Sequence, residues 1–112
     1  MDDAARRKRI DQLGDELYDA LRGRRTLTPL TERWPDMTIE DAYHVSLRMV
    51  NRRIEDDGER VIGKKIGVTS LAVQEMLGVF QPDLGYLNEK MMYQNCGPMP
   101  ISDQLNQPRA EV

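Results

Sequence analysis

Residues 60–68 read RVIGKKIGV, and at this stretch the sequence pattern changes from that of helices to that of a strand. It is too short and too rich in β-branched residues for a helix, so it predicts a strand. Residues two apart in a strand share a face, which puts Gly63, Lys65 and Gly67 on one side and Lys64 on the other. The two glycines leave open space around the Lys65 amine, so Lys65 is a candidate for contact with an anionic ligand. The alternative is an ordinary solvated strand lysine, with glycines that serve packing.

Two amphipathic helices are predicted before this strand. Over residues 3–22, apolar side chains recur at three- and four-residue steps, and Gly23 is a plausible end. Thr38 is a natural N-cap for a second helix, which continues an apolar stripe to about Glu55. Between the helices, residues 26–35 hold two prolines and three threonines, which predicts a loop.

Short elements are predicted after the strand. Thr69 and Ser70 can cap a short helix over residues 71–77, which Gly78 would close. Residues 84–87 and 91–94 are predicted to be short strands, and residues 107–112 to enter a further strand. The predicted fold class is therefore α+β, with a helical region over residues 1–58 and an α+β segment over residues 59–112.

Composition excludes several classes of protein. The 112 residues include one cysteine and one histidine, which excludes a disulfide framework within the chain and a zinc site of the usual kind. A net charge of −3, from 16 basic and 19 acidic side chains, argues against a nucleic-acid partner. No apolar run approaches the roughly 20 residues of a membrane helix, and the charged N-terminus is no secretory signal. We therefore expect a cytoplasmic protein with no membrane partner.

Two carboxylates are candidates for chemistry. Asp83 follows Pro82 in a predicted turn, where an aspartate usually caps its own backbone, but it could serve as an acid/base group if it faced a cleft. Glu111 lies beside Arg109 and is either an exposed carboxylate or a ligand for a hard cation such as Mg²⁺, which prefers oxygen donors. One carboxylate alone does not make a metal site.

Three motifs, in this order, resemble the signature of the 2-keto-4-pentenoate (2-hydroxypenta-2,4-dienoate) hydratases. They are residues 58–70, residues 76–87, and residues 100–102 followed by 107–111. These hydratases act in meta-cleavage degradation of aromatic compounds and belong to the fumarylacetoacetate-hydrolase-like superfamily, with the 4-oxalocrotonate decarboxylases as close siblings. The resemblance covers nearly the whole chain from Leu13 onward.

The resemblance assigns roles to three residues, and two residues near them in the sequence are expected to bind substrate. Lys65 matches a lysine that lines the family's active site, where it would be catalytic and bind substrate, and Asp83 matches a second catalytic position. Leu84 and Arg109 would bind substrate. Glu111 matches the first glutamate of a motif that holds Mg²⁺ or Mn²⁺. The sequence ends before the second glutamate of that motif, so we expect a truncated N-terminal portion, with most of the family's β-rich catalytic domain missing, that is inactive alone.

The activity that the resemblance implies is that of a hydro-lyase. It would add water to the small-molecule substrate 2-hydroxypenta-2,4-dienoate and give 4-hydroxy-2-oxopentanoate. Lys65 would supply positive charge or shuttle a proton, and Asp83 would serve as the acid/base group at the carbon that water attacks. The alternatives are the decarboxylase sibling and a non-catalytic helical interaction module. A homo-oligomer, in association with a decarboxylase sibling, is the expected assembly.

Overall fold

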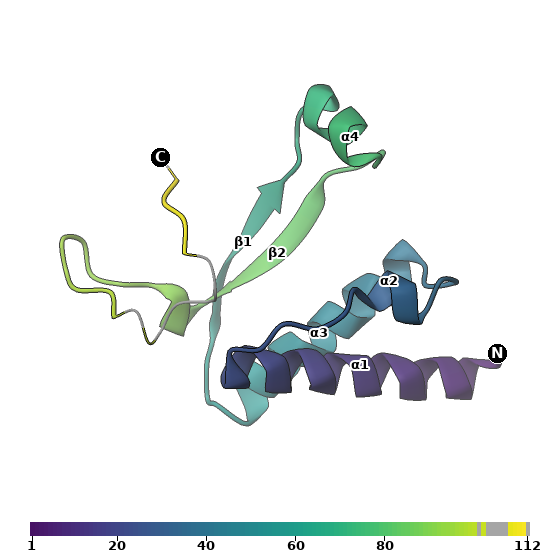
Figure 1. The fold of residues 1–112 in the computed structure, drawn as a ribbon. Coiled ribbons are helices and arrows are strands. Elements are labelled where there is room, and N and C mark those ends of the chain that lie inside the picture. The colour runs from purple at the N-terminus through teal and green to yellow at the C-terminus, as the bar shows by residue number, and fades with distance from the viewer. Residues whose placement is uncertain (101, 103–107, 112) are drawn as a thin grey trace. The chain divides into compact units, whose positions relative to one another are not determined.

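The computed structural model describes residues 1–100, 102 and 108–111 of the chain. It divides into two compact units, which we describe separately (Figure 1). The first unit comprises Met1–Gly58 and Pro98–Val112, and the second comprises Glu59–Gly97. Helices followed by a two-stranded antiparallel sheet confirm the predicted α+β class.

The first unit begins with helix α1 (Asp3–Gly23). The Asp2 side chain accepts a hydrogen bond from the backbone N–H of Ala5 at 2.7 Å and so satisfies one of the free amides of the first turn. The helix ends at Gly23 as expected, but the residue that adopts the left-handed conformation, with φ 53°, is Arg24. Its backbone N–H donates to the carbonyl of Leu21, as in other left-handed helix ends.

Helix α2 (Leu30–Arg33) lies where a loop was predicted. Pro29 precedes its first residue, and the fixed φ of proline is compatible with a helix start. One helical turn puts Leu30 and Trp34 on the same side, joined by a 2.8 Å hydrogen bond from the Trp34 amide to the Leu30 carbonyl. Trp34 is 3% exposed and Leu30 packs beside it, so burial of these two side chains outweighs the loop-forming prolines and threonines.

Helix α3 (Ile39–Glu55) runs side by side with α1 and packs against it (Figure 1). Thr38 caps it as predicted, and Asp41 completes a capping box by accepting from the Thr38 amide at 2.8 Å. Leu13, Trp34 and Val45 form the core between the helices. Ion pairs surround that core: Arg6 with Asp41, Asp15 with Arg48 and Arg52, Glu16 with Arg33, and Arg22 with Asp57.

The second unit is a hairpin of strands β1 (Val61–Gly67) and β2 (Asp83–Asn88), with helix α4 (Leu71–Leu77) in the connection (Figure 1). The predicted first strand, the predicted short helix and its closing residue Gly78, which has φ 70°, are confirmed. Of the two predicted caps, Ser70 is the residue whose side chain accepts from the first turn, at 3.2 Å from the Val73 amide.

Two further strand predictions do not hold for the residues that the structure describes. Residues 91–94 do not form a strand, because a 3₁₀ turn, η1 (Glu89–Met91), follows β2 and turns the chain out of the hairpin. At the C-terminal end, residues 108–111 have no regular structure, whereas residues 107 and 112 of that predicted strand lie outside the described residues. Among the described helices, none is both long and apolar enough to span a lipid bilayer.

Candidate functional site

The hairpin register places Lys65 and Asp83 on one face. Lys65 pairs with Gly85, and Asp83 pairs with Gly67. Directly opposite residues of an antiparallel pair point to the same side, as do residues two apart along one strand. Lys65 and Asp83 are therefore diagonal neighbours, a relation that typically separates residues by about 7–8 Å.

Glycine makes this face open. We call it the glycine face and define it as Gly63, Lys65, Gly67, Asp83, Gly85 and Leu87. A Cβ atom added at Gly67 or Gly85 would meet no other atom within 4 Å, and one at Gly63 would come no closer than 3.7 Å to the Leu87 side chain. The Lys65 and Asp83 side chains are both exposed. The face therefore has room for a small molecule beside a cation and a carboxylate.

The opposite face of the hairpin has a different character. The Lys64 Nζ atom lies 5.8 Å from the centroid of the Tyr86 ring, its partner across the strands, and Ile66 pairs with Leu84. A cation over an aromatic ring is a common structural contact, so Lys64 has a local role. Leu84 thus lies on the face opposite Lys65, and the hairpin does not bring this predicted substrate-binding residue together with Lys65 and Asp83.

A strained turn ends the glycine face. Val68, directly after β1, has φ 55°, an unusual left-handed conformation for a β-branched residue. The side-chain amide of Gln74, a buried residue of α4, donates to the Val68 carbonyl at 3.0 Å and holds the turn. Strain of this kind is retained where the surrounding structure fixes it, and it often occurs at functional sites. Sequence reasoning missed Gln74, because a glutamine in a short helix carries no signal for such a contact.

Arg109 and Glu111 belong to the first unit, in a segment without regular structure, and both are exposed. Their roles in substrate and metal binding stay predictions. Among the described residues, no group of three or more His, Cys, Asp or Glu side chains is placed to hold a metal ion. Mg²⁺ requires near-octahedral oxygen ligation, and a single carboxylate at Glu111 does not fit that requirement.

Comparison with known proteins finds two kinds of similar enzyme. The relatives in sequence are hydratases, and the similar solved structures are of a decarboxylase. The chain is a homologue of 2-hydroxypent-2,4-dienoate hydratase from Pseudomonas putida, with 64% identity over 102 residues, which are 91% of this chain and 46% of that one. It is 55% identical to 2-hydroxyhexa-2,4-dienoate hydratase from Comamonas testosteroni over 91% of this chain and 39% of that one. No family model matches the sequence.

The structural comparison agrees with the sequence comparison. The chain superposes on 4-oxalocrotonate decarboxylase from Pseudomonas putida G7, complexed with magnesium and adipate, with a TM-score of 0.68 and 31% identity. The match covers 75% of this chain and 32% of the decarboxylase. The chain therefore spans less than half the length of the relatives that it matches, and it corresponds to their N-terminal portion.

Proposed function

We propose that this chain supplies the N-terminal portion of a hydro-lyase of meta-cleavage aromatic catabolism. The enzyme adds water to 2-hydroxypenta-2,4-dienoate and releases 4-hydroxy-2-oxopentanoate. The observation that carries the proposal is the 64% identity to a 2-hydroxypent-2,4-dienoate hydratase over 91% of the chain. The glycine face supports it, because a cation and a carboxylate share an open surface there.

The proposed chemistry adds one water molecule and converts the C2 hydroxyl to a carbonyl. The C2 hydroxyl loses its proton as C5 gains one, which leaves a C2 carbonyl conjugated to a C3–C4 double bond. The oxygen of water then bonds to C4 while a base takes one of its protons, and C3 is protonated. The Lys65 ammonium would stabilise the negative charge of the 2-hydroxy acid and of the enolate that forms at its C2 oxygen. The Asp83 carboxylate would take the proton from the attacking water.

A divalent cation belongs to the proposal, with Glu111 as one carboxylate ligand. The related decarboxylase is described in complexes with magnesium and with calcium, and Mg²⁺ or Mn²⁺ is the expected ion. Because the described residues do not fit a complete metal site, the isolated chain should bind Mg²⁺ weakly and show no turnover. Titration calorimetry that gave micromolar Mg²⁺ affinity for the 112-residue chain would contradict this expectation.

The assay needs a protein of full length. In the hydratase chimera, this chain replaces the matching segment of the Pseudomonas putida hydratase. Lys65→Met should lower kcat/KM for 2-hydroxypenta-2,4-dienoate by at least about 100-fold, and Asp83→Asn should lower kcat by a similar factor. Lys64→Met is the matched control, since Lys64 lies on the opposite face, and it should change kcat/KM by less than about 3-fold. Equal losses for the two lysine variants would refute the assignment.

A second candidate activity is decarboxylation of 4-oxalocrotonate. The structural similarity to a 4-oxalocrotonate decarboxylase favours it. Turnover of the two substrates by the chimera and by a second chimera, built on the decarboxylase, separates the activities. We further propose a cytoplasmic enzyme that forms a homo-oligomer, with the decarboxylase sibling as a candidate partner, and sedimentation of the two chimeras together tests that association.

A further inference from the structure

The two units bury different kinds of side chain. In the first unit, the buried residues include a hydrophobic core of Leu13, Tyr18, Ala20, Trp34, Val45 and Val50. In the second unit (Glu59–Gly97), all of which is described, the buried residues are polar: Glu59, Gln74 and Asn88. The second unit therefore has no hydrophobic core of its own.

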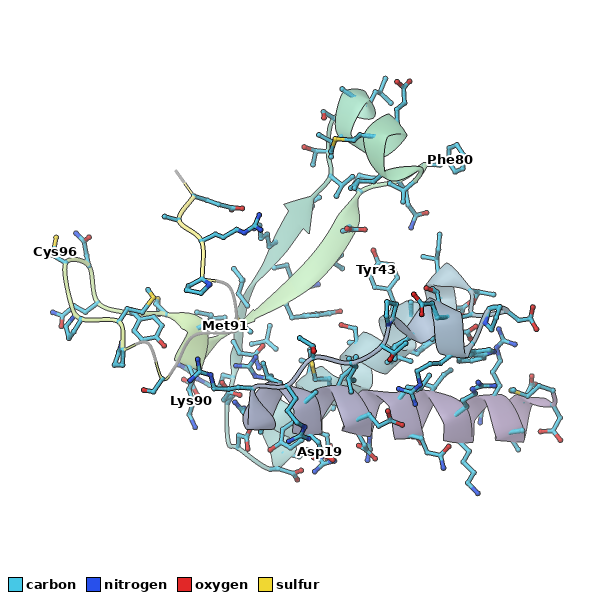
Figure 2. All side chains as sticks on the ribbon, viewed as in Figure 1. Asp19, Tyr43, Phe80, Lys90, Met91 and Cys96 are labelled. Carbon is cyan, nitrogen blue, oxygen red and sulfur yellow. The ribbon has the colours of Figure 1, made fainter. Side chains whose placement is uncertain are left out.

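Apolar side chains of the second unit lie on its surface instead. They are concentrated on α4 and the turn after it, in what we call the α4 surface: Leu71, Val73, Met76, Leu77, Val79 and Phe80. Leu71 is 76% exposed, Met76 75% and Phe80 97%. Figure 2 shows the Phe80 ring projecting from the end of the α4 turn, away from the hairpin.

Helix α4 has a wide apolar side. Five of the seven residues in its sequence, LAVQEML, are apolar, the polar Gln74 is directed to the Val68 carbonyl, and Glu75 is its one charged residue. A helix normally buries such an apolar side against another part of a protein. A two-stranded hairpin is marginal in water by itself, and a unit of about 40 residues without disulfide or metal usually needs a partner. The α4 surface is therefore one side of an interface.

The length of the relatives indicates which polypeptide covers the α4 surface. The relative with 64% identity is more than twice as long as the matched segment, and two further hydratases, of 55% and 39% identity, extend similarly beyond it. We propose that the α4 surface packs against the polypeptide that forms the remaining part of these hydratases, and that the second unit is stable only in that complex. The proposal rests on the homology and not on the reaction, so it holds for either proposed activity.

Hydrogen exchange tests the proposal without any substitution. Amides of residues 71–80 should exchange at least about 100-fold more slowly in the hydratase chimera than in the 112-residue chain. Amides in the middle of α1 serve as the reference, because the first unit contains its own core in both proteins. Equal exchange of residues 71–80 in the two proteins would overturn the proposal. So would protection of these amides in the 112-residue chain at concentrations where sedimentation shows a dimer, because the occupant would then be a second copy.

Substitution gives an independent readout. Phe80→Asp should leave the circular dichroism of the 112-residue chain unchanged, because the ring is exposed there, but it should lower the Tm of the chimera by about 5 °C or more. Ile39→Asp is the control: Ile39 is 59% exposed in the first unit, and its substitution should have the same effect in both proteins. A Phe80→Asp effect of equal size in the two proteins would refute the interface, and the exchange experiment decides if the variant chimera does not fold.

Discussion

Replacing Gly14 with alanine should destabilise the helical unit, although alanine is the better helix former. Gly14 lies within α1 and faces Val45 and Arg48 of α3 at short range. A Cβ atom there would stand 2.9 Å from the Val45 carbonyl oxygen, and still closer to the Cβ and Cγ atoms of Arg48. These atoms belong to the α3 backbone or are bonded close to it, so they cannot rotate away. The two helices would have to separate.

Two opposing effects set the size of the change. Helix propensity alone favours alanine over glycine by about 1 kcal/mol. Overpacking in a well-packed contact costs about 1–3 kcal/mol, and contacts this short lie at the upper end of that range. We therefore expect a net loss of about 2 kcal/mol in the free energy of unfolding. Separation of the helices would also loosen the core around Val45 and Leu13.

The fluorescence of Trp34 provides the assay, because it is the only tryptophan and lies in the core of the helical unit. Urea unfolding is measured for the wild-type chain, Gly14→Ala and Gly23→Ala. At Gly23, also in α1, a Cβ atom would approach the guanidinium of Arg25, the far end of a flexible side chain. Gly23→Ala should therefore be neutral or stabilising by up to about 1 kcal/mol. If both variants raised the urea midpoint, the close approach of α1 and α3 would be refuted.

Three further predictions concern the same unit. Arg6 and the Thr38 cap hold the pKa of the Asp41 carboxyl well below its ordinary value of 3.8. The stability that this carboxylate contributes is therefore complete above about pH 5, and it is lost as the pH falls from the ordinary pKa toward the lowered pKa of the folded state. Asp41→Asn should flatten the fall of the urea midpoint with acidification. Trp34→Ala should cost about 3–5 kcal/mol by circular dichroism, because the ring is buried in the core, and a loss below about 1 kcal/mol would contradict that packing. The hydrogen bond from the Tyr18 hydroxyl to Asp57 raises the pKa of Tyr18, so Asp57→Asn should lower the tyrosinate titration midpoint, measured by absorbance with Tyr18→Phe as the blank.

The helix boundaries that the sequence predicted well depend on local chemistry. Thr38, Ser70 and Gly78 act within one turn of their own helices, by a side-chain cap or by a left-handed conformation. Such signals are complete in a short window of sequence, so both ends of α4 and the start of α3 were predicted to the residue.

The elements that were predicted wrongly depend on residues far away in the chain. Helix α2 exists because Leu30 and Trp34 reach a core formed by α1 and α3, and nothing in its prolines and threonines indicates that core. Residues 91–94 read MMYQ and are apolar enough for a short strand, but a strand needs a neighbour, and η1 turns the chain out of the hairpin. Local pattern cannot supply either fact.

The candidate site was also predictable only in part, because one of its features depends on local sequence and another on the pairing of two strands. Alternation along β1 separates Lys65 from Lys64, but it cannot say which of the two shares a face with Asp83, because that depends on the pairing with β2. A slip of one residue would turn the glycine face over and place Lys64 beside the carboxylate. The register in fact shifts between Val61 and Gly63, and it is regular from Gly63 to Gly67. A larger effect of Lys65→Met than of Lys64→Met would therefore support this register and the proposed role of Lys65 in one measurement.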